Sequence, residues 1–455
     1  MAKFFRNLYQ SKKSKARLGE INTAHGTIKT PAFVPVGTKG TIKALLPLLI
    51  KEIKIQVAFV NTYHLVTHPG AEIIEKAGGI HKFANLSIPL MSDSGGFQVF
   101  SLANSKVKNQ FFDVAQDDLE RSRMGQKSKL QVKNQKKEWV KILQDDGQRP
   151  ERPMIEKISD DGVRFRSVFD GELIEFTPEK SMKYQKMIGA DINMALDECT
   201  YYPSSHNYAS KAMDRTHKWL TRCINQVKNQ KSKIKSENKN SKFQILDSKF
   251  QFLYGVIQGA TFEDLRKKSA EFVVSQNIDG VAIGGVSVGE TKKEMREQVE
   301  WVAEYLSNDK PVHLLGVGQV DDIIDLVKQG IDTFDCVEPT RLARMGIIYQ
   351  IGNARYRVFS SASLPKGGSP KRLTQKQISS LSKNIDILKG QYRCNLESVD
   401  EGCNCYVCTN FTKAYLHHLF KQREILGYNL ATYHNLWVME RLMEGIRMKI
   451  KEDEI

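Results

Sequence analysis

Three cysteines and one histidine near the carboxyl end have the spacing of a metal site. Cys403, Cys405 and Cys408 lie within six residues of one another, and His434 follows after 25 intervening residues. Thiolate and imidazole ligands hold structural zinc in a closed tetrahedron that leaves no position for a reactive water. The pattern predicts one structural Zn²⁺, against the alternative of three unrelated thiols and a helix-surface histidine. Cys394 lies nearby and could compete as a ligand.

A second set of residues could carry acid–base and nucleophilic chemistry. In the run SDSGGF, Asp93 directly follows an apolar run, and two glycines let the backbone approach a ligand closely. Polar or glycine residues end other apolar runs in the same way: Asp197, Cys199, Gln258, Gly284, Gly285 and Asp335. Two carboxylates at one place can divide the work between a nucleophile and a proton carrier. Viewed singly, each residue could instead be a cap, a turn or an ion pair.

Eight short apolar runs are predicted to be the strands that position these residues. They span residues 32–36, 56–60, 88–92, 191–196, 251–257, 280–283, 312–315 and 333–337. Amphipathic stretches such as 263–276 and 292–306 follow several of them, which is the alternation of parallel strands with covering helices. Eight such units predict a (β/α)8 TIM barrel, with a doubly wound open sheet as the alternative. In a barrel the strand ends share one face, where active sites lie.

Composition divides the chain further. The barrel is predicted to occupy residues 1–390, with insertions rich in Lys, Gln and Asn at about 104–157 and 225–250. Such segments favour solvated structure with some helix. Residues 391–455 are predicted to form a zinc-binding subdomain and C-terminal helices, in which Gly427 interrupts the helical pattern.

Charge and cysteine content indicate the partner and the compartment. Lys and Arg number 68 against 52 Asp and Glu, a net charge of +16, which favours an anionic partner such as nucleic acid or an acidic membrane surface. A generally basic protein is the alternative reading. Seven cysteines, three of them clustered, suit metal binding in a reducing compartment. The sequence has no signal-peptide pattern and no apolar span of membrane length, so we expect a cytoplasmic protein with no membrane partner.

Seven motifs in order resemble those of the tRNA-guanine transglycosylases of the bacterial type. They are SDSGGFQVFS (92–101), MALDEC (194–199), YGVIQG (254–259), AIGGVSVGE (282–290), HLLGVGQVDD (313–322), DTFDCVEPTRLAR (332–344), and CNCYVC with EILG and TYHNL. The resemblance covers nearly the whole chain outside the insertions. It implies a TIM barrel with an inserted zinc subdomain. It also implies exchange of guanine at the anticodon wobble position of G-U-N tRNAs for 7-aminomethyl-7-deazaguanine, in queuosine biosynthesis.

The resemblance assigns a chemical role to each carboxylate. Asp335 would be the nucleophile that attacks the ribose and forms a covalent enzyme–RNA intermediate, and Asp93 would be the general acid and base and help to hold the base. Asp197 would accept hydrogen bonds from the ring N1 and the exocyclic amine of guanine. Gln258 and the Gly285 amide would donate hydrogen bonds to the carbonyl oxygen of the base.

Further positions would shape the base site. The resemblance implies that Phe97 stacks on the base and that the Val286 carbonyl accepts a hydrogen bond from the aminomethyl group, with Glu290 supporting that backbone. Valine at position 288 is typical of members that take the small 7-aminomethyl base, whereas glycine admits bulkier queuine. Cys199 is a weaker candidate for substrate contact, since a buried cysteine is usually a small apolar residue.

Two motifs would contact the tRNA. Arg341 and Arg344 would read the neighbours of the wobble guanosine, since arginine pairs with phosphate and stacks on unpaired bases. The same contacts are implied for Thr340, Leu342 and Ala343, and for Gly316, Val317, Gly318, Gln319, Val320, Asp321 and Asp322. The arginines could instead be surface ion-pair partners.

The sequence departs from the family pattern beside these arginines, and other functions stay open. Glu338 replaces a commonly apolar residue and Met345 replaces an asparagine, and both lie beside the arginines predicted to read the anticodon. A non-catalytic tRNA-binding paralogue and a glycoside hydrolase are the alternative functions. The family also suggests a homodimer in which one subunit catalyses and the other steadies the tRNA.

Overall fold

The computed structural model describes residues 3–97, 155–167, 171–237, 251–350, 384–401 and 403–455. Most of the insertion predicted at 104–157 therefore lies outside the described residues, as does the second insertion from residue 238 onward.

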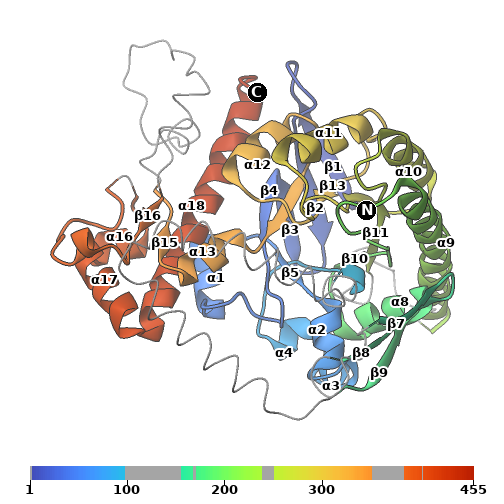
Figure 1. The fold of residues 1–455 in the computed structure, drawn as a ribbon, viewed down its shortest axis with the longest axis horizontal. Coiled ribbons are helices and arrows are strands. Elements are labelled where there is room, and N and C mark those ends of the chain that lie inside the picture. The colour runs from blue at the N-terminus through green and yellow to red at the C-terminus, as the bar shows by residue number, and fades with distance from the viewer. Residues whose placement is uncertain (1–2, 98–154, 168–170, 238–250, 351–383, 402) are drawn as a thin grey trace.

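Eight parallel strands form the central sheet. In spatial order they are β4 (Ala32–Pro35), β14 (Thr333–Cys336), β13 (Val312–Leu314), β12 (Gly280–Ile283), β11 (Phe252–Ile257), β10 (Ile192–Met194), β6 (Leu90–Ser92) and β5 (Ala58–Val60). A parallel bridge between Val36 and Phe59 joins the two ends of this order and closes the ring. The predicted TIM barrel is confirmed, and all eight predicted apolar runs contain a barrel strand (Figure 1).

The strands close because both of their faces are buried. Along β11, for example, Phe252, Tyr254 and Val256 belong to the cluster inside the barrel, whereas Leu253 and Ile257 pack under the surrounding helices. The covering helices are α8 (Pro178–Ile188), α9 (His206–Glu237), α10 (Glu263–Ser275), α11 (Lys292–Ala303), α12 (Val320–Val327) and α13 (Glu338–Arg344). The two amphipathic stretches predicted from the sequence are α10 and α11. Shorter helices are α1 (Pro47–Ile53), α2 (Thr62–Thr67), α3 (Ala71–Lys76) and α4 (Ile80–Phe83).

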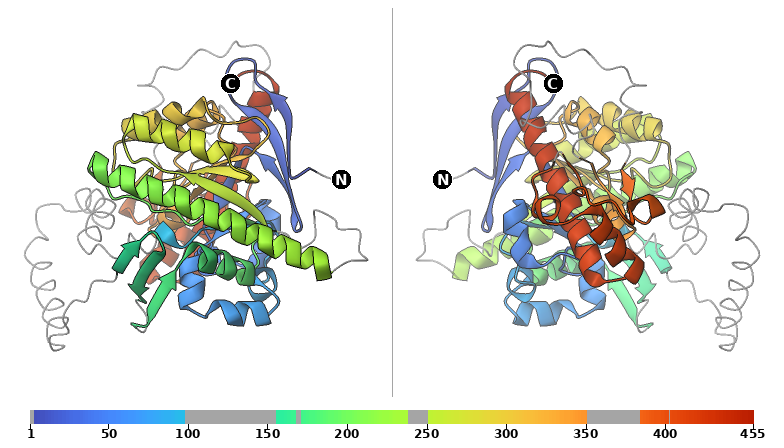
Figure 2. Two further views of the ribbon diagram at one scale, coloured as in Figure 1. Left: turned by 90° about the vertical axis from the view of Figure 1, so that its right-hand side faces the viewer. Right: turned by 90° about the vertical axis from the view of Figure 1, so that its left-hand side faces the viewer.

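An antiparallel sheet of β1 (Phe5–Gln10), β2 (Arg17–Thr23) and β3 (Gly26–Thr30) covers the N-terminal end of the barrel (Figure 2). The Phe4 ring stacks on Phe252 at the start of β11, with ring centroids 3.7 Å apart. Arg17 forms a buried ion pair with Asp332, Nη2 to Oδ2 2.6 Å. Because this end is packed with side chains, a site is expected at the opposite, C-terminal end of the strands.

The described residues include two segments at the edges of the predicted insertions. Strands β7 (Ile155–Ser159), β8 (Gly162–Arg166) and β9 (Leu173–Phe176) form an antiparallel sheet, and Phe165 packs 5.4 Å from the ring of Tyr63 in α2. Residues 225–237 continue helix α9, as expected of an insertion with some helix.

The C-terminal part contains β15 (Ile347–Ile348), β16 (Ile385–Asp386), the 3-10 turn η1 (Gly390–Tyr392), α16 (Tyr406–Asn410), α17 (Lys413–Gln422) and α18 (Ile425–Lys451). Helix α18 runs from this part along the barrel, against α13 and β4 (Figures 1 and 2). The expected interruption at Gly427 is wrong. The break falls at Arg423, whose φ is 59°, and Gly427 lies inside α18, where an added Cβ would meet the Cβ of Leu419 at 3.0 Å. Across the described ranges, no helix has the length and apolar character needed to cross a bilayer.

Candidate active site and metal centre

Asp93 directly follows strand β6 and is 9% exposed. The side-chain amide of Asn61 donates to its Oδ2. The backbone N–H of Thr62 donates to Oδ1 at 2.7 Å, and the N–H of Gly95 donates to the same oxygen at 3.2 Å. Asn61 and Thr62 follow the neighbouring strand β5, so two adjacent strand ends fix the orientation of this carboxylate.

Asp335 lies in strand β14 and is 8% exposed. Its Oδ1 accepts a hydrogen bond from the N–H of Gly316 at 2.9 Å and lies 3.2 Å from Nε2 of His313. The other ring nitrogen of His313 is 2.9 Å from the Thr333 hydroxyl, and the ring stacks on Phe59, which anchors it inside the barrel. Among the described residues nothing forms a hydrogen bond with Oδ2 of Asp335, so one carboxylate oxygen is oriented and the other is available.

The two carboxylates lie at the same end of the barrel. Strand order runs β14, β4, β5, β6, so two strands separate them along the rim. Cys336, after Asp335, pairs with Pro35 at the end of β4, and Ser92, before Asp93, pairs with Val60 at the end of β5. The structure therefore brings both predicted catalytic residues to the C-terminal rim.

Asp197 follows strand β10 and is buried. Its Oδ2 accepts a hydrogen bond from Nε2 of Gln258 at 2.7 Å, and its Oδ1 accepts one from the Ser94 hydroxyl at 3.0 Å. Burial raises the pKa of Asp197 above its ordinary value. Gly96 lies against this residue, because an added Cβ would meet the Asp197 carbonyl oxygen at 2.6 Å. The Asp93 loop and Asp197 thus form one connected site.

Gln258 supplies both a donor and an unsatisfied acceptor. While its Nε2 donates to Asp197, its buried Oε1 has no hydrogen-bond partner within the described part of the chain. A buried polar atom without a partner costs about 1–3 kcal/mol, so such atoms commonly mark a place that a ligand fills. Gly285 has a φ of +62°, and a Cβ there would lie 2.3 Å from Oε1, so glycine is required.

Two other predicted site residues, Cys199 and Phe97, differ in what their side chains offer to a substrate. Burial and the neighbouring Asp197 raise the pKa of the Cys199 thiol to about 12, so the thiol is neutral at neutral pH. Its sulfur lies 3.7 Å from the Thr200 carbonyl oxygen. Phe97, by contrast, is 43% exposed, so its ring has surface to offer a stacking partner.

The loop after β12 is held at its far end by Glu290. The Glu290 carboxylate accepts hydrogen bonds from the backbone N–H groups of Ser287 and Val288, the latter at 2.9 Å. Ser287 adopts a left-handed conformation with φ of 59°. Val286 is buried and Val288 half-buried. Glu290 therefore supports the backbone beside Val286.

Sequence reasoning missed several residues of this site. Asn61 and Thr62 directly follow a predicted strand, so the rule that found Asp93 could have found them as well. His313 is a lone polar residue in a predicted buried strand, which is a weaker signal. Arg266 lies on α10 and is fully buried, yet in the sequence it resembles any other cation of an amphipathic helix.

The first predicted RNA motif surrounds the start of α12. Gly316, with φ of +76°, donates to Asp335, which ties this loop to the predicted nucleophile. Asp322 is buried and pairs with Arg296 at 2.8 Å and with Lys292 at 3.2 Å. Its carboxylate is thus engaged in packing α12 on α11, and Val317 is also buried.

The second predicted RNA motif is helix α13. Arg341 is exposed, whereas Thr340 and Ala343 are buried and hold the helix in place. Burial and the neighbouring Arg341 lower the pKa of Arg344, whose buried Nη1 has no partner among the residues described. Burial, Arg344 and Lys39 also lower the pKa of Lys43. Cations therefore gather at this edge of the rim.

Burial raises the pKa of Glu338, and a hydrogen bond from Gln319 opposes that rise. The Glu338 carboxyl group, where the family commonly has an apolar residue, thus links helix α13 to the 316–322 motif through Gln319.

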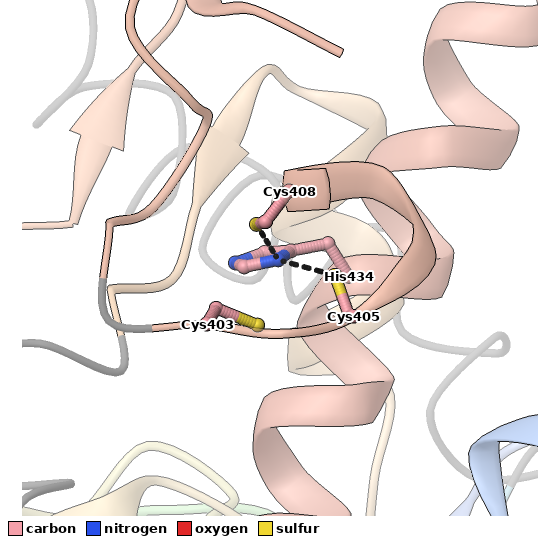
Figure 3. Close-up of side chains that lie close together, drawn as sticks. All are labelled: Cys403, Cys405, Cys408 and His434. Atoms are coloured by element: carbon pink, nitrogen blue, oxygen red, sulfur yellow. Dashed lines mark hydrogen bonds between the residues drawn. The ribbon is translucent and has the colours of Figure 1, made fainter. Parts of the chain in front are cut away.

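The predicted metal ligands converge (Figure 3). The sulfurs of Cys403, Cys405 and Cys408 and a nitrogen of His434 lie within 4.8 Å of one another, and all four residues are buried. His434 Nδ1 is 3.4 Å from the Cys405 sulfur and 3.3 Å from the Cys408 sulfur. Its Nε2 is 2.8 Å from the Tyr349 carbonyl, so Nε2 carries the hydrogen and Nδ1 can face an ion.

The donors therefore fit a tetrahedral metal ion. Cys394 is exposed and does not belong to this group.

A second group, His25, His81 and Asp191, fits a hydrogen-bond network better than a metal site. The two imidazoles stack with centroids 3.4 Å apart and planes at 10°, so their in-plane lone pairs cannot meet at one ion. Asp191 lies 2.8 Å from His25 Nδ1 and accepts from the Leu90 N–H. Burial alone would raise the pKa of Asp191, but hydrogen bonds from both histidines lower it to about 2.

Comparisons with known proteins identify the family of this chain. The family model described as queuine tRNA-ribosyltransferase matches residues 11–137 and 123–455. A protein of Caldanaerobacter subterraneus subsp. tengcongensis with that name is 38% identical over 443 residues, which cover 97% of this chain and 92% of the relative. One of Aquifex aeolicus is 38% identical, covering 97% and 93%, and one of Shouchella clausii is 35% identical, covering 99% and 92%. The chain therefore belongs to the queuine tRNA-ribosyltransferase family, a family of pentosyltransferase enzymes.

Proposed function

We propose that this enzyme exchanges guanine at the wobble position of G-U-N tRNAs for 7-aminomethyl-7-deazaguanine, in queuosine biosynthesis in the cytoplasm. The observation that carries the proposal is the shared rim of Asp93 and Asp335, two nearly buried carboxylates on separate strands. The bonded pair of Asp197 and Gln258 joins the Asp93 loop through Ser94. The names of the relatives agree with transfer of a base to tRNA.

The reaction is a double displacement. Oδ2 of Asp335 attacks the anomeric carbon of the target nucleotide, the bond from that carbon to guanine breaks, and Asp93 protonates the departing base. The entering base then loses a proton to Asp93 and attacks the same carbon, which releases Asp335. Two inversions give net retention, and the RNA backbone stays intact.

Base recognition uses the groups around Asp197. Its carboxylate accepts two N–H hydrogen bonds from the guanine edge. Gln258 and the Gly285 amide donate hydrogen bonds to the carbonyl oxygen. Phe97 stacks on the ring, and Cys199 and Gly284 line the same site. The Val286 carbonyl accepts from the aminomethyl group, while the side chain of Val288 limits the size of the substituent.

Base binding should weaken as the pH is lowered from neutrality. Burial raises the pKa of Asp197, so this carboxyl group takes up a proton at a higher pH than the ordinary value of about 4. Protonation removes one of the two acceptors that guanine needs. The KM for guanine should therefore rise on acidification in the wild type. Asp197→Asn should have a high KM with little pH dependence, and a wild-type KM that is flat with pH would contradict this role.

The tRNA partner lies over α12 and α13. Arg341 and Arg344 contact the nucleotides beside the wobble guanosine, which must leave its stack to reach the rim. The net charge of +16 supports an RNA surface here, and so does Arg344 Nη1, which has no hydrogen-bond partner among the residues that the structure describes. The exposed residues of the 316–322 and 340–344 motifs extend this RNA surface. The buried residues of the same motifs position the backbone.

Incorporation of labelled guanine tests the function. The wild type should place label in intact tRNA with a G-U-N anticodon, and a tRNA whose wobble guanosine is replaced should take up none. Added 7-aminomethyl-7-deazaguanine should compete with the label. A non-catalytic paralogue would bind tRNA without incorporating label, and a glycoside hydrolase would release sugar from a carbohydrate substrate.

We also propose that Cys403, Cys405, Cys408 and His434 hold one structural Zn²⁺ per subunit. Three thiolates and one imidazole are the donors zinc prefers, and they fill its four positions. The ion would stabilise the fold and would take no part in the exchange.

A homodimer is the assembly that the surface supports. Leu46 and Leu48, at the start of α1, and Ile425 and Leu426, at the start of α18, are all large apolar side chains with exposed fractions of 45–79%. The two helices are in contact, and Asn429 donates to the carbonyl of Ala44, so these side chains belong to one region. Exposed apolar clusters of this kind mark protein interfaces.

Placing lysine in this apolar region should separate the subunits. Sedimentation analysis should show a dimer for the wild type and a monomer for the double variant Leu48→Lys and Ile425→Lys, because two buried charges oppose association. The matched control Leu173→Lys, at an exposed leucine on β9, should remain dimeric. A wild type that is monomeric at all concentrations would refute the assembly.

A further inference from the structure

Arg266 is a fully buried arginine whose guanidinium lies behind the proposed base site. Its Nε donates to the carbonyl of Ala260 at 2.7 Å, and its Nη1 lies 3.4 Å from the carbonyl of Ile257. Ile257 is the last residue of β11, directly before Gln258, and Ala260 lies two residues after Gln258. The guanidinium thus fixes the backbone on both sides of Gln258.

The same guanidinium also holds the next loop of the rim. Nη1 donates to the carbonyl of Gly284 at 2.6 Å, and Nη2 donates to the carbonyl of Gly285 at 2.7 Å. Nη2 also donates to Oε1 of Gln298 on α11, at 2.6 Å. Within the described residues, no carboxylate forms an ion pair with Arg266. Burial lowers its pKa only to about 10, so the group is a cation at neutral pH.

Two consecutive carbonyls that face one guanidinium fix the direction of the N–H groups that follow them. In a trans peptide the N–H points opposite to the C=O of the same unit. The N–H groups of Gly285 and Val286 must therefore point away from Arg266. Consistent with this, the Gly285 N–H donates to the sulfur of Cys199, which is a weak hydrogen-bond acceptor. Both residues are buried, and neither N–H donates to a protein oxygen in the part of the chain that the structure describes.

We propose that Arg266 is a positioning residue that presents the Gly285 and Val286 N–H groups as a pair of donors for the carbonyl oxygen of the base. The inference rests on the proposed function, since it names how that site recognises guanine. A departing guanine carries developing negative charge on this oxygen, and fixed backbone donors stabilise such charge. The guanidinium also polarises both peptides through their carbonyls, which strengthens the N–H groups on the opposite side.

The test compares guanine with 6-thioguanine, which keeps both N–H donors of the base edge but has sulfur, a poor acceptor, in place of the oxygen. Equilibrium binding should show a wild-type preference for guanine. In Arg266→Lys one ammonium cannot span four carbonyls, so the preference should fall by about tenfold or more. A variant that is merely destabilised would bind both bases less well and keep the ratio.

Arg17→Lys is the matched control. Arg17 is also buried, and it donates to the carbonyls of Ser307 and Lys310 and to Asp332, far from the rim. Its variant should lower the unfolding temperature and leave the base preference unchanged. If Arg266→Lys does not fold, Gln298→Leu removes one acceptor of the guanidinium and should reduce the preference by about threefold.

The possible outcomes separate the two claims. An unchanged preference in the folded Arg266 variant, or in Gln298→Leu if Arg266→Lys does not fold, overturns the inference while the proposed function stands. A wild type that incorporates no labelled guanine into tRNA overturns the proposed function, and with it the role of Arg266.

Discussion

Asp335→Asn is expected to abolish the covalent enzyme–RNA adduct and to reduce base exchange by about 10⁴-fold or more, because the nucleophile is lost. An asparagine fits the same space, and its side-chain oxygen can accept the hydrogen bond from Gly316 that Oδ1 accepts in the wild type. The fold and the affinity for tRNA should therefore stay near wild type. The adduct is measured on a denaturing gel after incubation with tRNA, and tRNA binding is measured separately.

Two further variants test whether the loss of the adduct is specific to Asp335. Asp325→Asn, at a surface aspartate paired with Arg296, should trap RNA like the wild type. Asp93→Asn should also reduce exchange, because Asp93 moves the protons, yet it keeps the nucleophile in place. Full trapping by Asp335→Asn would remove this residue as the nucleophile, and loss of tRNA binding in the same variant would show that the substitution disturbs more than the chemistry.

The barrel was predictable because its strands are buried on both faces. Each strand reads as a short continuous apolar run, and helix periodicity follows several of the runs, so α10 and α11 could be placed as well as the strands. The N-terminal sheet β1–β3 was not predicted, since its strands alternate buried with exposed or half-buried residues in short polar segments. The break before α18 was misplaced because Arg423 takes a left-handed conformation that glycine usually adopts.

The candidate site was predictable where a strand ends in a carboxylate or a glycine pair. Asp93, Asp197 and Asp335 follow this rule, and the barrel brings their strand ends to one rim. The residues that orient them were harder to find. His313 reaches Asp335 from within a strand, and Arg266 contacts the rim from a helix, so only the packed fold reveals either role. Tertiary contacts of single polar side chains leave no periodic signal in a sequence.

Loss of a cysteine ligand should have the second largest effect. It should lower the stability of the fold and the affinity for tRNA more than the affinity for guanine. Cys405→Ala is expected to lose bound zinc, and because a structural site contributes its binding energy to folding, the unfolding temperature should fall sharply. His434 lies within α18, which packs on α13, the helix of Arg341 and Arg344.

Loosening α18 in this way should weaken tRNA binding more than guanine binding, since Asp197 and Gln258 lie on other strands. Metal content, thermal unfolding and the two affinities are measured on Cys405→Ala beside Cys394→Ala, whose exposed thiol lies outside the cluster and should change none of them. A Cys405→Ala protein that keeps one zinc per chain would show that Cys405 is not a ligand. Equal losses of tRNA and guanine affinity would show that the metal centre supports the whole barrel and not the α13 surface alone.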